Sequence, residues 1–190
     1  MEMKGSRTEK NLMAAFAGES QARNRYSFYA KVAADEGYVQ IANVFLETAD
    51  NERAHAYSFF SLLDGGTPEL TAAYPAGPVH DTVENLRNAA DGELMEWGTL
   101  YPEFAEVAEE EGFKRAAAAF RKATEAEKYH ERRYRKLLAN LEGGQVFRKA
   151  EAGLWKCNEC GYVHEGAEAP KVCPLCGKPQ AYFEVYGENY

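Results

Sequence analysis

The sequence predicts an all-α bundle of four long helices, followed by a small, metal-stabilised module rich in loops or β-structure. Apolar residues recur at spacings of three and four through residues 6–142, the period of helices that bury one face. All four cysteines lie between positions 157 and 176. Residues 153–190 show no helical period, and a module this small usually needs a metal or disulfides in order to fold.

Glycines and prolines mark the ends of the expected helices. Ser6 and Glu9 have the form of a capping box that begins the first helix. The breaks fall at 37, 65–78, 112 and 143–144, so the expected helices cover 8–35, 38–64, 81–110 and 113–141. Pro102 should kink the third helix, because proline lacks the N–H that an α-helix needs. The expected units are 1–146 for the bundle, 147–152 for a linker and 153–190 for the cysteine module.

The connection between the second and third expected helices is longer than the other two. When extended, residues 65–79 would reach roughly 50 Å, which exceeds the roughly 40 Å length of the second helix. A crossover along the whole bundle is therefore possible. That arrangement is typical of ferritin-like bundles and not of simple up-and-down bundles.

Polar residues interrupt the apolar stripes of all four helices at one level of the bundle. They are Glu19 in the first helix, Glu52 and His55 in the second, Glu93 and Glu96 in the third, and Glu127 and His130 in the fourth. Glu19 precedes Glu52 by 33 positions and Glu93 precedes Glu127 by 34. The two helical hairpins therefore resemble weak repeats of one unit, which offers Glu from its first helix and Glu-x-x-His from its second.

Five neighbouring buried carboxylates cannot all ionise without a counter-charge. Any one of them alone would be an ordinary buried polar contact. Arg23 is the single basic residue that the stripes include, so ion pairing would leave most of the acids unpaired. Two metal ions supply the charge, and carboxylates with imidazoles suit iron or manganese. Seven ligands for two metals is a generous supply, and His55 and Glu96 are the surplus pair expected to exchange with oxidation state.

Two tyrosines and the two remaining histidines are weaker candidates for a role at these sites. Tyr26 and Tyr101 follow Glu19 and Glu93 by about two turns, so they are candidates for hydrogen-bond donors to the ligands, although core packing explains them equally well. His80 and His164 have no such surroundings and are expected at the surface.

The cysteines form two paired motifs, Cys157-Asn-Glu-Cys160-Gly and Cys173-Pro-Leu-Cys176-Gly, twelve residues apart. Four thiolates at this spacing predict a tetrahedral metal site. The spacing alone does not distinguish iron from zinc. Iron is favoured because the module follows a bundle that is predicted to hold two irons and to need electrons.

Charge and hydropathy narrow the classes of partner. The formal net charge is −8 and no basic block occurs, which argues against nucleic acid. No apolar run approaches the roughly 18 residues of a membrane span, and the N-terminal residues lack the apolar core of a secretory signal. Together with clustered, metal-type cysteines, these features predict a cytoplasmic protein.

Beyond these patterns, the chain closely resembles rubrerythrins over nearly its whole length. The motifs that carry the resemblance are AFAGESQARNRY, ETADNERAH, GELMEW, EAEKYHERR and CNECGYVHEG…CPLCG. It implies a cytoplasmic, dimeric, ferritin-like protein with a C-terminal rubredoxin-like domain that reduces hydrogen peroxide. The ligand roles that it implies are as follows: Glu52 and Glu127 bridge two irons, Glu19, Glu93 and His130 are terminal ligands, Glu96 and His55 exchange at one iron, and Cys157, Cys160, Cys173 and Cys176 bind a single iron.

The expected function is a non-haem iron peroxidase of oxidative-stress defence that is re-reduced through the cysteine-bound iron. No G-x-G-x-x-G fingerprint occurs, so the electron donor is expected to be a rubredoxin or a separate NAD(P)H-dependent reductase. The alternatives are a ferroxidase or iron store, a dioxygen-activating oxidase, and a non-enzymatic zinc-ribbon interaction protein. The expected working unit is a head-to-tail homodimer, because the fourth helix carries the cysteine module away from its own di-iron site.

Overall fold

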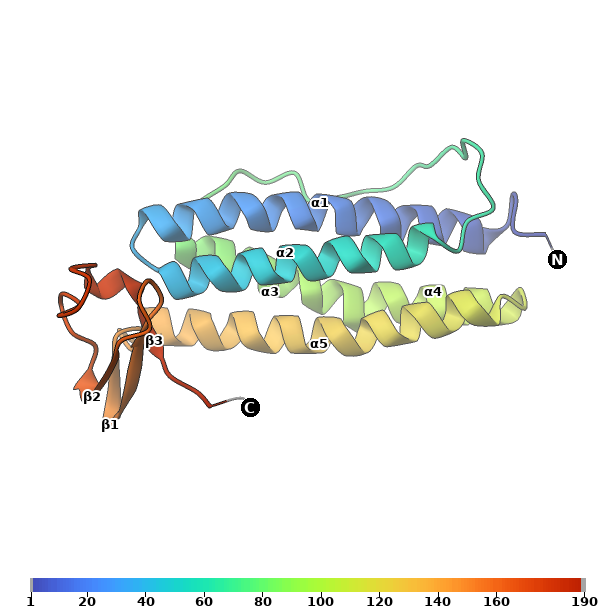
Figure 1. Ribbon diagram of the computed structural model, residues 1–190. Helices are drawn as coiled ribbons and strands as arrows, with labels where there is room; N and C mark the ends of the chain where they lie inside the picture. The colour runs from blue at the N-terminus through green and yellow to red at the C-terminus, as the bar shows by residue number, and fades with distance from the viewer. Residues whose placement is uncertain (1, 189–190) are drawn as a thin grey trace.

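A bundle of long helices and a three-stranded module make up the computed structural model, which describes residues 2–188 (Figure 1). The bundle contains α1 (Arg7–Asp35), α2 (Val39–Phe60), α3 (Thr82–Met95), the π-helical turn η1 (Glu96–Leu100), α4 (Tyr101–Glu110) and α5 (Lys114–Glu142). α1 and α2 form one antiparallel hairpin, and α3 with α4 forms a second with α5. The predicted fold class is confirmed. Within residues 2–188, no helix is long and apolar enough to cross a bilayer.

The connection between α2 and α3 runs along the outside of α1, so that α2 and α3 point in the same direction (Figure 1). Tyr74 fastens this crossover by donating its hydroxyl to the carbonyl of Ala14 at 3.0 Å. This is the ferritin-like connection that the sequence favoured. The expected end of the second helix at residue 64 is wrong. α2 ends at Phe60, because the next residues tighten into i→i+3 turns and Gly65 has a φ of +88°.

Two apolar clusters fill the bundle on either side of its acidic level. The cluster nearer the cysteine module contains Tyr26, Phe45 and Leu86, all at most 2% exposed. The cluster nearer the N-terminus contains Phe59 and Phe120, both at most 1% exposed. The apolar packing that stabilises the bundle therefore also closes off its middle from water.

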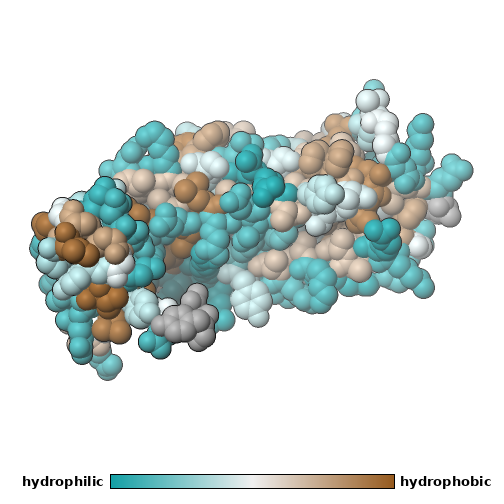
Figure 2. Space-filling model, in the orientation of Figure 1, coloured by the Kyte–Doolittle hydropathy of each residue, from teal (hydrophilic) through white to brown (hydrophobic). Residues whose placement is uncertain are grey.

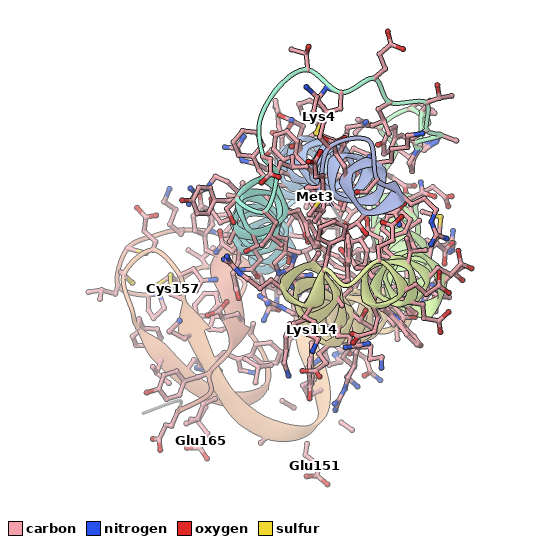
Figure 3. All side chains as sticks on the ribbon, turned by 90° about the vertical axis from the view of Figure 1, so that its right-hand side faces the viewer. Met3, Lys4, Lys114, Glu151, Cys157 and Glu165 are labelled. Atoms are coloured by element: carbon pink, nitrogen blue, oxygen red, sulfur yellow. The ribbon has the colours of Figure 1, made fainter. Side chains whose placement is uncertain are left out.

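The cysteine module is an antiparallel sheet in the order β2-β1-β3, formed by β1 (Arg148–Cys157), β2 (Val163–Glu168) and β3 (Phe183–Val185), with a short 3₁₀ helix at Gln180–Tyr182. Buried Trp155 and Phe183 pack on Cys157 and Cys173 in its core. The module lies beyond the end of α5, and its far tip, marked by Glu151 and Glu165, points away from the helices (Figures 1 and 3). β1 begins inside the expected linker, and the domain boundaries themselves stay a prediction.

The start of α1 is fastened at both sides. Ser6 accepts from the backbone N–H of Glu9 at 2.9 Å, as predicted, while the Glu9 carboxylate accepts from Gly5 rather than from Ser6. Glu111, at the end of α4, accepts from the backbone and hydroxyl of fully buried Thr8 at 2.9 and 2.7 Å. Burial opposes ionisation of Glu111, but the hydrogen bonds from Thr8 and Arg7 outweigh it and lower its pKa to about 2.

Replacement of Glu111 by Gln should therefore destabilise the bundle at neutral pH by about 1–3 kcal/mol, because buried donors of Thr8 lose a charged acceptor. A group with a depressed folded-state pKa stabilises the fold above its ordinary pKa of 4.5 and ceases to do so as the pH falls toward about 2. The difference from wild type, measured by urea unfolding followed by helical circular dichroism, should shrink over that range. Glu110→Gln is the control, because Glu110 forms only an exposed pair with Arg7. A Glu111→Gln difference that is independent of pH would contradict this assignment.

Candidate metal centre

Two clusters of ligand atoms lie side by side in the middle of the bundle and share two carboxylates. One cluster contains Glu19, Glu52, His55 and Glu127, and the other contains Glu52, Glu93, Glu127 and His130. Within each cluster the ligand atoms lie within 4.8 Å of one another. The structure therefore brings together six of the seven candidate bundle ligands, and they come from all four long helices.

The shared carboxylates divide their oxygens between the two imidazoles. His55 Nδ1 lies 2.9 Å from Oε1 of Glu127 and 3.1 Å from Oε2 of Glu52. His130 Nδ1 lies 2.8 Å from Oε2 of Glu127 and 3.2 Å from Oε1 of Glu52. Each carboxylate thus presents one oxygen to each cluster. Carboxylates that bridge a pair of metal ions present their oxygens in this way.

Burial makes the clusters costly without cations. Glu19, Glu52, Glu93 and Glu127 are each 0% exposed. Among residues 2–188, several carboxylate oxygens of the site accept no well-directed hydrogen bond: Glu19 Oε2, Glu52 Oε1, Glu93 Oε2 and both oxygens of Glu127. An ionised carboxylate in such a place is strongly destabilised unless a cation binds it. The unpaired oxygens and the two ring nitrogens therefore fit two metal ions.

The pKa shifts of the buried acids and imidazoles also show that the site lacks positive charge. Burial first, and then repulsion from Glu52, raises the pKa of Glu93 to about 8. Burial and neighbouring acids also raise the pKa of Glu19 well above its ordinary range. Burial works against protonation of the imidazoles, but contacts with Glu127 and Glu52 outweigh it and raise the pKa of His55 to about 10 and of His130 to about 12. The side chains alone can balance their charge only by holding protons, which metal ions displace on binding.

Two tyrosines donate hydrogen bonds to the two carboxylates that the clusters do not share, Glu19 and Glu93. The hydroxyl of Tyr26 donates to Oε1 of Glu93, and the hydroxyl of Tyr101 donates to Oε1 of Glu19. Both tyrosines are at most 2% exposed. Each donor comes from the helical hairpin opposite its acceptor, so these bonds also tie the two hairpins together. The sequence left Tyr26 and Tyr101 equally consistent with core packing, and the structure shows that they also bond to the site.

Glu96 is the one predicted ligand that lies outside both clusters. It is 8% exposed and begins η1, where the N–H of Tyr101 donates to the carbonyl of Glu96, five residues earlier. Burial, and repulsion from Glu93 and Glu127, raise its pKa well above the ordinary range. His55 instead belongs to a cluster. Of the surplus pair, the structure therefore places His55, and not Glu96, in a cluster.

The spacing between glutamate and tyrosine in the sequence indicates the extra residue of η1. Tyr26 follows Glu19 by seven positions, whereas Tyr101 follows Glu93 by eight. A π-helical turn is an α-helical turn with one extra residue, so it accounts for the mismatch between the two hairpins. Pro102, which lacks an N–H, lies two residues after the end of this turn. A second difference concerns Arg23, which was expected on the inner stripe of the first helix but is exposed. The acids therefore have even less counter-charge from side chains than the sequence suggested.

The four cysteines form a separate site in the module. Their sulfur atoms lie within 4.8 Å of one another, with Cys157–Cys176 at 3.8 Å and Cys160–Cys173 at 3.6 Å. A tetrahedron with metal–sulfur bonds of about 2.3 Å has edges of about 3.8 Å, whereas a disulfide is about 2 Å long. Burial opposes ionisation of Cys173, but backbone N–H groups of Cys176 and Leu175 help lower its pKa to about 7. The distances between the four sulfur atoms are thus those of a tetrahedral metal site and not of disulfides.

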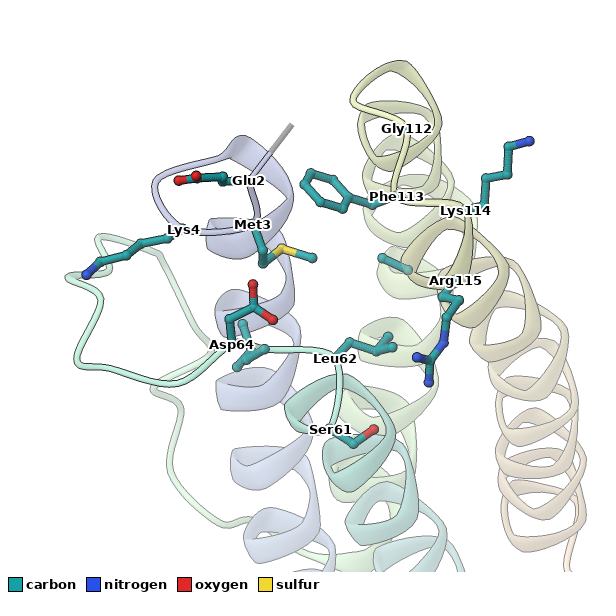
Figure 4. Close-up of a pocket in the computed structure, with 12 residues that line it drawn as sticks. Glu2, Met3, Lys4, Ser61, Leu62, Asp64, Gly112, Phe113, Lys114 and Arg115 are labelled. Atoms are coloured by element: carbon teal, nitrogen blue, oxygen red, sulfur yellow. The ribbon is translucent and has the colours of Figure 1, made fainter.

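The candidate site is not an open surface pocket. A pocket of about 760 Å³ lies at the bundle end opposite the cysteine module, between the N-terminal residues, the end of α2 and the start of α5 (Figure 4). Met3, Leu62 and Phe113 line it, and none of the seven candidate bundle ligands does. The chemistry of the bundle therefore resides in its buried middle.

A ferritin-like bundle with paired carboxylate–histidine clusters, joined to a four-cysteine module, defines the class of di-iron carboxylate proteins with a rubredoxin-like domain. Comparison with known proteins agrees. The rubrerythrin family model matches residues 10–138, and the model for the rubredoxin-like domain of rubrerythrin matches residues 155–184. The chain belongs to the rubrerythrin family, and the cofactors of its two sites are iron.

Individual relatives cover almost the whole chain. A rubrerythrin of Porphyromonas gingivalis is 58% identical over 99% of this chain and 94% of its own length. Rubrerythrin-1 of Clostridium acetobutylicum is 56% identical over 99% of this chain and 98% of its own length. A solved structure of nigerythrin in a fully reduced, all-ferrous state has a TM-score of 0.64 at 33% identity and covers 96% of this chain and 91% of its own.

The shared carboxylates give a prediction about metal content. Wild-type protein from iron-sufficient cells should hold about three irons per chain, Glu127→Ala about one, and Glu19→Ala about two, because Glu127 belongs to both clusters and Glu19 to one. Elemental analysis measures this, with the cysteine-bound iron as internal standard and Glu106→Ala, an exposed change on α4, as control. Equal losses from Glu19→Ala and Glu127→Ala would contradict the sharing.

Proposed function

We propose that the protein is a non-haem iron peroxidase that reduces hydrogen peroxide to water and serves in oxidative-stress defence. The observation that carries the proposal is the pairing, in one chain, of a buried two-metal site with its own four-cysteine iron site. A store or ferroxidase has no need of an attached electron carrier, whereas a reductase must be re-reduced after every turnover. Each peroxide takes up two electrons and two protons and yields two water molecules.

In the proposed reaction, Glu52 and Glu127 would each hold both irons, Glu19, Glu93 and His130 would each hold one, and Glu96 and His55 would exchange at one iron. When bound, the two irons supply the electrons and the Lewis acidity that cleavage of the O–O bond requires. Tyr26 and Tyr101 fix the orientation of the two carboxylates that they contact. The apolar clusters on either side exclude bulk water from the site.

Substrate access is proposed at the seam between α2 and α5. The side chain of His55 is 19% exposed and that of His130 is 10% exposed, whereas those of Glu19, Glu52 and Glu127 are 0% exposed. The two imidazole rings stack at a centroid distance of 5.8 Å along this seam. A small, neutral molecule such as hydrogen peroxide suits an opening of this size better than a bulky organic substrate does.

Electrons are proposed to enter through the cysteine-bound iron from a rubredoxin or a separate reductase. Val172 and Leu175 are 58% and 68% exposed beside Cys173 and Cys176. Hydrophobic residues gather on the visible face of this module (Figure 2). An apolar surface next to the metal suits brief docking of a protein partner. Metal-binding cysteines also suit a reducing compartment, so we place the protein in the cytoplasm.

The first test compares oxidants. Fully reduced protein should be oxidised much faster by hydrogen peroxide than by dioxygen, as followed by stopped-flow absorbance of the cysteine-bound iron. Glu96→Ala should slow the reaction by roughly 10-fold or more, because the oxidised pair then lacks one carboxylate ligand. Glu106→Ala, an exposed change on α4, should react as wild type does. Equal rates with dioxygen and peroxide would favour an oxidase or ferroxidase instead.

A second test addresses the proposed head-to-tail homodimer. From His130 to the end of α5 the helix rises roughly 18 Å, so a chain's own cysteine-bound iron lies far along the bundle from its own di-iron site. A dead Cys160→Ala variant and a dead variant with Glu52→Ala and Glu127→Ala should regain part of the peroxidase activity when their subunits exchange. Each productive heterodimer then brings one intact bundle to one intact cysteine module. Mass spectrometry confirms exchange, and confirmed exchange without recovery would mean transfer within one chain.

A further inference from the structure

Trp97 links the π-helical turn to α5 on the outside of the bundle. Its indole Nε1 donates to Oε2 of Glu131 at 3.1 Å, and the Nζ of Lys128 lies 5.3 Å from the centroid of its ring. The other oxygen of Glu131 accepts from Arg135 at 3.1 Å, and Arg135 donates to Asp91 in α3 at 2.7 Å. These contacts form one continuous network from α3 through α5 to η1.

The turn that Trp97 fastens has a weaker backbone than the helices around it. Its closing hydrogen bond spans five residues, from Tyr101 to Glu96, and Pro102 has no N–H to donate. Single π-helical turns inside α-helices occur frequently at functional sites. The position of this backbone therefore depends on side-chain contacts such as that between Trp97 and Glu131.

Trp97 lies at the level of the metal centre. On α5, Glu127 and His130 face inward, while Lys128 is exposed and Glu131 is half-buried. On η1, Glu96 is buried and the next residue, Trp97, contacts the outer side of α5. The Trp97–Glu131 contact thus joins the turn that carries Glu96 to the helical turn that carries His130.

Because Glu96 lies outside both clusters, its carboxylate and a bound metal ion would have to come closer together in order to bond. The carboxylate keeps a defined place for this only if the backbone stays fixed. We propose that Trp97 is a positioning residue: its N–H, through Glu131, fixes η1 so that Glu96 reaches the oxidised di-iron pair. This inference rests on the di-iron site of the proposed function.

The test is the reduction potential of the di-iron site in the full-length, iron-loaded protein. A carboxylate ligand stabilises the more highly charged oxidised pair, so its loss in Glu96→Ala should raise the potential. Trp97→Phe keeps the aromatic ring but loses the N–H, and it should raise the potential in the same direction by a smaller amount. The double variant should equal Glu96→Ala alone, because Trp97 acts through Glu96. The potential of the cysteine-bound iron should stay unchanged in every variant.

Matched controls separate positioning from general stability. Arg87→Met removes another surface link between α3 and α5, the Arg87–Glu142 pair at 2.9 Å, and should leave the potential unchanged. Glu131→Ala should reproduce the shift of Trp97→Phe from the other side of the contact. Glu131→Gln, which keeps an oxygen acceptor, should restore most of the wild-type value. The Glu131 variants decide the matter if Trp97→Phe fails to retain iron.

Two results would overturn the role of Trp97. One is an unchanged di-iron potential in two-iron Trp97→Phe or Glu131→Ala protein. The other is a Trp97→Phe shift that adds in full to that of Glu96→Ala, since the two residues would then act independently. A wild-type protein without iron in the bundle would contradict the proposed function instead, so the two failures are distinguishable.

Discussion

Mutual repulsion among buried carboxylates is the constraint on which the bundle depends. Glu19, Glu52, Glu93 and Glu127 are fully buried at one level, and Glu96 is nearly so. Two imidazoles cannot neutralise five acids, and among residues 2–188 the ion pairs of the two clusters involve no other basic side chain. The cost of burying unpaired charge is several kcal/mol per ion. Two metal ions remove that cost, and they do so with ligands from every long helix. Metal binding and correct packing of the four long helices therefore depend on each other.

The two helical hairpins contribute to the site as near-repeats of one unit. Each gives one carboxylate from its first long helix and one Glu-x-x-His from its second, and each gives a tyrosine to the other hairpin's carboxylate. The second hairpin departs from the repeat by one residue, at η1. That departure provides a buried carboxylate, Glu96, beside a site whose ligand atoms are otherwise already gathered. The asymmetry of the repeat is thus located where a change of ligand with oxidation state would occur.

Much of this could be predicted from the sequence, because charged residues inside an apolar stripe are rarely neutral with respect to function. The buried helix faces should be apolar, yet they carry carboxylates and histidines. Metal ligation explains these residues, and it also explains the spacing of the cysteines. Arg23 was misplaced because spacings of three and four allow either Ala22 or Arg23 to follow Glu19 on the stripe, and the structure buries Ala22. The early end of α2 at Phe60 depends on turn contacts that have no periodic signal. Tyr26 and Tyr101 occupy positions where aromatic residues normally pack in the core, so only coordinates could show where their hydroxyls point. Trp97 was missed because its partner, Glu131, is distant in sequence and lies on the outer side of α5.

The most direct test of the account is anomalous X-ray diffraction at the iron absorption edge from crystals of the natively iron-loaded protein. The account requires two adjacent anomalous peaks in the bundle, both within bonding distance of Glu52 and Glu127, and one peak among the four cysteine sulfurs. Of the two bundle peaks, one should contact Glu19 and the other Glu93 and His130. A single bundle peak, or none, would contradict the claim that two irons neutralise the buried acids.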